Sequence, residues 1–183
     1  MRLQEIGQKL AREGCANSAS ALLLNDLRAA HQTLLAAMAV VENLTAQGQA
    51  ERRSYTNARW RISQCSLARR TLWMQIFRHL LPRVNTKAAS DLAMLQSADE
   101  ELQRDSSSHV ATWHLARIET DWESYCEASR AVRSRMSVCI EAEKRILYPI
   151  LEHDAGFPIR PSCDSRRARN RVHPAGQSRC PLP

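Results

Sequence analysis

Apolar residues recur every three or four positions along four stretches of this chain, the spacing of one face of an α-helix. The first two stretches cover about residues 20–46 and 52–81. The third begins near Thr86, which we expect to be its N-cap, and the fourth covers about 119–151. Weak helix formers at 105–109 predict a break or kink within the third stretch. The pattern therefore predicts four long amphipathic helices.

Glycine and proline separate the first three of these stretches. Gly48 follows the first, and Pro82 ends the second, because proline lacks an amide donor and disfavours helix in the residue before it. Four amphipathic helices with short connections pack most economically as an up-down-up-down four-helix bundle. We expect an all-α bundle over 20–152, an N-terminal extension over 1–19 with at most a short helix of its own, and a C-terminal tail over 153–183.

The predicted inward faces are apolar with three exceptions. His31 and Glu143 fall within the stripes of the first and last helices, and Asp99 falls within that of the third. Because the first and last helices are neighbours in such a bundle, His31 and Glu143 can meet. A structural His31–Glu143 hydrogen bond is one interpretation. The other is a metal site that adds Asp99 and Cys139, one turn before Glu143.

The second helix is predicted to turn only apolar side chains inward, with bulky aromatic residues beside them. The expected inward positions are Cys65, Ala68, Leu72, Ile76 and Leu80.

Composition agrees with a cytoplasmic helical protein. The chain has 183 residues, 44% of them hydrophobic and 25% charged, with only 5 glycines. No uncharged apolar stretch reaches the roughly 20 residues of a membrane span, and the N-terminus lacks a signal-peptide apolar region. We therefore expect a soluble protein without a membrane partner.

The net charge of +7 is concentrated near the C-terminus, where 160–183 holds six arginines and one aspartate. This Arg-, Pro- and Ser-rich segment is too poor in large apolar residues to form a core, so we expect it to be disordered. Its arginines could contact nucleic acid or an acidic partner, but no aromatic platform accompanies them, and a solvated appendage is the simpler interpretation. The basic patch comprises Arg166, Arg167, Arg169 and Arg171.

Known catalytic motifs are lacking. The sequence contains no P-loop, no G-x-S-x-G, no G-x-G-x-x-G and no H-E-x-x-H, so we expect no enzymatic activity. The 6 cysteines form no C-x-x-C pair, which argues against a zinc ribbon or a thioredoxin-type site.

Three segments resemble the hemerythrin-like (HHE cation-binding) domain family. "DLRAAHQTLLAAM" is similar to the family's first helix, with His31 at the first ligand position. "IFRHLLPRV" and "AEKRILYPIL" resemble the ends of its second and last helices, and the resemblance covers about 22–152. It implies a four-helix bundle around a dinuclear iron centre that is built from histidines and carboxylates.

The resemblance also implies that this ligand set is incomplete. Counting back from Pro82 places one ligand pair on two apolar residues, Leu72 and Ile76. Counting back from Pro149 places the other on Cys139 and Glu143, and the third-helix histidine falls near Asp99. A full di-iron centre is not expected. Either a mononuclear iron site or no metal follows, with residues His31, Glu143, Cys139 and Asp99 as the candidate ligands.

Three functions remain open on this basis. The first is a hemerythrin-like bundle with a degenerate metal site and a non-catalytic binding or regulatory role. The second is a functional iron- or cation-binding or oxygen-sensing protein of that family. The third is a helical interaction module whose tail contacts nucleic acid or an acidic partner.

Overall fold

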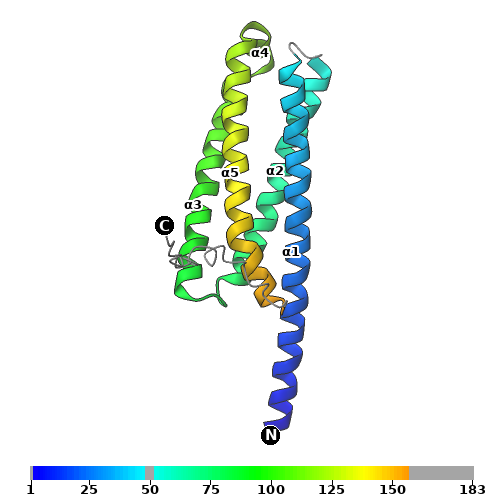
Figure 1. Cartoon of the computed structure of the whole chain (residues 1–183), viewed down its shortest axis with the longest axis vertical. Coiled ribbons are helices and arrows are strands. Elements are labelled where there is room, and N and C mark those ends of the chain that lie inside the picture. Colours follow the sequence, from blue (N-terminus) through cyan, green and yellow to red (C-terminus); the bar gives the residue numbers. More distant parts are fainter. Residues whose placement is uncertain (1, 48–51, 157–183) are drawn as a thin grey trace, which may run out of the picture.

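Five α-helices and no strand make up residues 2–47 and 52–156, which are the residues that the computed structural model describes (Figure 1). The four long helices run alternately up and down, which confirms the predicted all-α bundle. Short α4 lies at the end of the bundle where the chain passes from α3 to α5. The elements are α1 (Arg2–Ala46), α2 (Arg52–Leu80), α3 (Thr86–Thr112), α4 (Leu115–Thr120) and α5 (Trp122–Asp154).

Contacts between the long helices are unequal. Helix α1 packs against both α2 and α5, and α5 packs against α3. The α2 and α3 backbones, which would close the ring, approach each other far less. The bundle is therefore looser along the α2–α3 side.

Helix ends follow local chemistry. Helix α2 ends two residues before Pro82. Asn85, rather than the predicted Thr86, caps α3, and its side chain accepts a hydrogen bond from the Ala88 amide at 3.0 Å. The predicted break at 105–109 is wrong, because α3 continues to Thr112 and the chain turns only after it.

Two further helix boundaries differ from the sequence prediction. Helix α1 begins at Arg2, so no separate N-terminal helix forms, and α1 extends beyond the ends of its neighbours (Figure 1). Pro149 lies inside α5, which continues to Asp154, and so does not end the last helix. A proline removes one backbone hydrogen bond, and near a helix end the remaining bonds suffice to continue the last turn.

Three apolar clusters succeed one another along the bundle. The basal cluster fills the end near the α2–α3 connection, the central cluster fills the middle, and the aromatic cluster lies near α4. A layer of polar residues separates the basal cluster from the central one. The basal cluster contains Leu24, Leu27, Trp73, Ile76, Leu80, Leu92, Leu95, Leu147 and Leu151; the central cluster Leu34, Met38, Leu102, Met136 and Ile140; and the aromatic cluster Val41, Tyr55, Ala58, Trp113, Ile118 and Tyr125.

The predicted inward face of α2 is wrong in part. Ala68 is exposed, while the neighbouring Arg69 is buried in its place. The buried stripe continues through Trp73, Ile76 and Leu80. The inward face is therefore displaced by one residue in the middle of α2, and it carries a charge.

Some predictions concern residues outside this description. The basic patch of the tail lies beyond residue 156, so its predicted partners stay predictions. Within the described helices, none combines the length and the apolarity that crossing a membrane would require.

Candidate functional site

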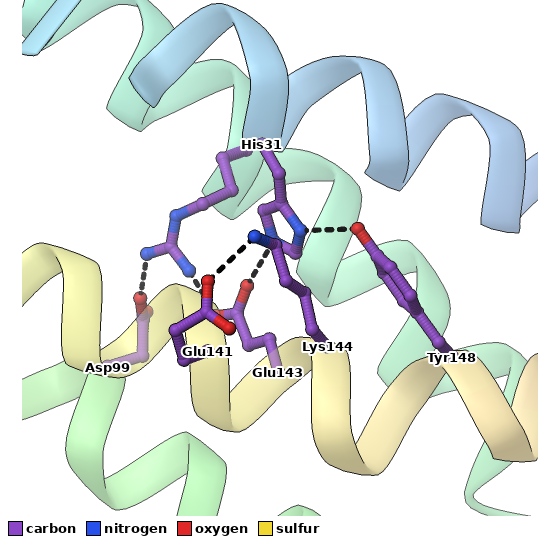
Figure 2. Close-up of polar contacts among 7 residues, drawn as sticks. His31, Asp99, Glu141, Glu143, Lys144 and Tyr148 are labelled. Atoms are coloured by element: carbon purple, nitrogen blue, oxygen red, sulfur yellow. Dashed lines mark hydrogen bonds and ion pairs between the residues drawn. The ribbon is translucent and has the colours of Figure 1, made fainter. Parts of the chain in front are cut away.

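One buried polar residue from each long helix contributes to a single layer across the bundle. They are His31 of α1, Arg69 of α2, Asp99 of α3 and Glu143 of α5, and each is less than 9% exposed. Figure 2 shows His31 and Glu143 pointing toward each other, with Asp99 on the neighbouring helix. Three of the four are the polar candidates predicted from the sequence. The fourth, Arg69, was not.

Arg69 connects the two carboxylates of this layer. Its Nη1 donates to Glu143 Oε1, and its Nη2 donates to Asp99 Oδ1 at 2.5 Å. The second Asp99 oxygen lies 3.3 Å from Nε of Arg70. Burial by itself lowers the pKa of Arg69, but the charges of Glu143 and Asp99 and the hydrogen bonds to them outweigh it, so the pKa is raised. The guanidinium is a fixed cation between two carboxylates.

His31 extends the network to the other side of Glu143. Its Nε2 lies 2.7 Å from Glu143 Oε2, and because a carboxylate accepts, Nε2 carries the hydrogen. Its Nδ1 lies 2.9 Å from the Tyr148 hydroxyl, which donates to it in this tautomer. The two rings also stack, with centroids 5.8 Å apart. The His31–Glu143 contact is the one that the structural interpretation of the sequence predicted.

The polar layer holds together the side of the bundle that is otherwise loose. The Arg69–Asp99 and Arg70–Asp99 ion pairs both join α2 to α3, whose backbones scarcely touch. Hydrogen bonds from a buried guanidinium to carboxylates are short and directional. The layer therefore fixes the distance and rotation of α2 relative to α3.

The donor atoms of this layer do not fit a metal ion. Both oxygens of Glu143 and both oxygens of Asp99 already face a donor, and both ring nitrogens of His31 are engaged. A cation would have to displace the Arg69 guanidinium, whose positive charge repels it. Within residues 2–47 and 52–156, no three His, Cys, Asp or Glu side chains are grouped as metal ligands would be.

The other positions that the resemblance assigns to metal ligands are Cys139, Leu72 and Ile76, and they lie in or beside the apolar clusters. Cys139 is partly buried against the central cluster, and burial raises the pKa of its thiol, which disfavours the thiolate that binds metals. Ile76 belongs to the basal cluster, and Leu72 is partly buried against it. Leu72 and Ile76 supply packing surface and no ligand atoms.

A second polar cluster lies at the basal end of the bundle, but it lacks the order of a nucleophilic triad. Ser20 Oγ lies 2.6 Å from His79 Nε2 and donates to Asp154 Oδ2 at 2.5 Å. Asp154 faces the same ring nitrogen, at 3.2 Å, whereas a triad needs the carboxylate on the opposite nitrogen. Ser20 is also fully buried, so its hydroxyl cannot meet a substrate. The cluster ties α1, α2 and α5 together.

A cavity of about 510 Å³ opens directly beside the polar layer, on the loose α2–α3 side. Arg69 and Asp99 form part of its wall, and most of the other lining residues come from α2, α3 and α5. The cavity lies within the range of about 300–1,000 Å³ that is typical of small-molecule sites. Its volume and lining therefore suit a small-molecule ligand.

No known protein family, curated protein or solved structure matches this chain. The geometry of the polar layer and the cavity is therefore the basis for a function. Sequence reasoning missed Arg69 and the residues that line the cavity. A signal for Arg69 was present, because it lies four residues before Trp73 and seven before Ile76, on the helical stripe of both.

Proposed function

We propose that this chain is a non-catalytic binding protein, a hemerythrin-like bundle in which an ion-pair layer takes the place of a metal centre. The observation that carries the proposal is the Arg69 guanidinium between Glu143 and Asp99. It supplies the positive charge that a metal would otherwise provide to these carboxylates. The layer then acts as a structural brace, and the adjacent cavity is the place where a ligand binds.

Further support comes from Leu72 and Ile76, the apolar residues at one of the family's ligand pairs. Ile76 and Leu72 pack with the basal cluster and leave no room for the imidazole and carboxylate that a second iron would need. Iron held by His31 and Glu143 alone would have too few protein ligands to compete with the Arg69 ion pair. The binding role of the bundle is thus proposed to be independent of metal.

Metal analysis of the purified full chain tests this proposal. After growth in iron-supplemented medium, we expect no stoichiometric iron and no oxo-bridge charge-transfer band in the absorbance spectrum. The Glu143→Gln variant should have the same background metal content as the parent chain. Stoichiometric iron in the parent that is lost in Glu143→Gln would instead support the iron- or oxygen-sensing alternative.

A further inference from the structure

The cavity beside the polar layer has a mostly apolar wall. Its volume of about 510 Å³ is enough for a small organic molecule. The side chains that line it come mainly from α2, α3 and α5, with Val41 from α1, so a ligand there would fill the space between α2 and α3. Its apolar lining includes Ile62, Leu67, Leu102, Val110, Val132 and Met136.

One wall of this cavity carries a buried cation with no counter-charge. Arg133 lies on the inward stripe of α5 and is 8% exposed. Its Nη1 donates to Ser129 Oγ at 2.5 Å, and no carboxylate of the described residues pairs with it. A guanidinium that is largely removed from water and lacks an anion is unfavourable. An anion in the cavity would relieve that cost.

A second guanidinium faces the same part of the cavity. Arg59 of α2 lies over the rings of Tyr55 and Tyr125, 5.8 and 5.7 Å from their centroids, and has no carboxylate partner among the described residues. The remaining cationic residues of the wall, Arg69 and Arg70, are already paired with Asp99. The end of the cavity near α4 is therefore positive, and no carboxylate of residues 2–47 or 52–156 compensates this charge.

Two further side chains of the wall, His109 and Ser106, are consistent with a positive, hydrogen-bonding end of the cavity. Burial, with the charges of Arg59 and Arg133, lowers the pKa of His109 to about 4, so this cavity residue is neutral at physiological pH and adds no charge. The buried Ser106 hydroxyl, also in the wall, has no hydrogen-bond partner. Hydrogen-bond capacity and positive charge thus coincide at one end, and most of the cavity surface is apolar.

We propose that the cavity binds a small amphipathic carboxylate, with its head at Arg133 and Arg59 and an aromatic or aliphatic body along Leu102, Val132 and Met136. A guanidinium matches a carboxylate in a two-pronged hydrogen-bonding geometry. The apolar wall rejects small hydrated anions such as inorganic phosphate, since these would lose their water without a body to bury. The inference rests on the proposed binding function and names its ligand class.

Isothermal titration of the full chain with 4-phenylbutyrate tests this ligand class, with 4-phenylbutanol, octyl phosphate and inorganic phosphate as comparison probes. We expect 4-phenylbutyrate to bind at least about tenfold more tightly than the alcohol, because a charge-assisted hydrogen bond is lost in the alcohol. Inorganic phosphate should not bind. Equal affinity for acid and alcohol would overturn the carboxylate head while leaving a binding protein, and tighter binding of octyl phosphate would reassign the ligand to phosphate monoesters.

The Arg133→Met variant locates the site, and Arg130→Met, an exposed arginine on the same helix, is its matched control. We expect about a tenfold or greater loss of 4-phenylbutyrate affinity in Arg133→Met and parental affinity in Arg130→Met. Should Arg133→Met fail to fold, Arg59→Met provides the same readout, with a several-fold loss. Parental affinity in the folded variants, or no binding of any probe to the parent, would overturn the proposal. Neither result depends on iron content, which is the separate test of the metal-free bundle.

Discussion

Two buried arginines of this bundle have opposite surroundings. Arg69 lies in the polar layer between two carboxylates, and its charge is matched from α3 and α5. Arg133 lies about three turns away along α5 from the level of Glu143, and a serine hydroxyl is its hydrogen-bond partner. Both are shielded from water to a similar degree. What differs is whether the protein supplies the anion.

This difference separates a structural role from a binding role. A charge that the fold itself neutralises has no remaining affinity for a ligand, and its removal harms the fold. A charge that the fold leaves uncompensated costs stability until an anion arrives. Arg69 therefore stabilises the fold, whereas Arg133 is the arginine that we propose to bind the ligand.

Removing the compensated arginine should have the largest effect. Arg69→Met leaves Glu143 and Asp99 buried without their common cation, so we expect the free energy of unfolding to fall by about 3–5 kcal/mol. Urea denaturation followed by circular dichroism measures this change. A loss below about 1 kcal/mol would mean that the carboxylates find water or another partner, and that the layer is not a closed network.

The matched change, Arg133→Met, sharpens the contrast. No buried carboxylate loses its partner in this variant, and an uncompensated cation disappears from the protein interior. We expect the free energy of unfolding to change by no more than about 1 kcal/mol in either direction. If Arg133→Met were as destabilising as Arg69→Met, the distinction between the two arginines would fail.

A smaller effect is expected at the edge of the polar layer. Tyr148→Phe removes the hydroxyl that faces His31 Nδ1 and keeps the stacked ring. Tyr148 is only partly buried, so water can take over part of this hydrogen bond. We expect a loss of about 1 kcal/mol in the same denaturation experiment. A loss comparable to that of Arg69→Met would show that the network depends on its rim as much as on its centre.

The sequence predicts the inward faces of α1 and α3 more accurately than that of α2. The inward positions of His31 on α1 and Asp99 on α3 agree with the sequence prediction, because a single polar residue in an apolar repeat is easily seen. The stripe of α2 was misplaced near Arg69, since Leu72 and Trp73 are both apolar and either can continue the repeat. Only packing against neighbouring helices decides between these two registers.

Charge counting would have found Arg69, whereas nothing local indicates the cavity. Two inward carboxylates and one histidine leave a deficit of positive charge, which a buried cation from the second helix would satisfy. The cavity, in contrast, results from the separation of α2 and α3, a property of the assembled bundle. Arg133 was missed because an arginine inside a helix usually lies on the solvated face.

A further predicted effect concerns the pH dependence that burial and the uncompensated charges impose through His109. Burial and the charges of Arg59 and Arg133 lower its pKa from 6.5 to about 4. The unfolded chain therefore binds a proton below about pH 6.5, whereas the folded chain binds it only near pH 4, so stability is lost as the pH falls through this window.

The His109→Gln variant should lose less stability over this pH range than the parent, and His153→Gln, an exposed change on α5, should lose as much as the parent. Urea denaturation of the three proteins at pH 7 and pH 5 measures the difference, and an equal loss of stability in parent and His109→Gln would contradict the lowered pKa of His109. Because a bound carboxylate would offset Arg59 and Arg133, 4-phenylbutyrate should raise the pKa of His109 in the parent chain, which NMR titration of its ring can follow.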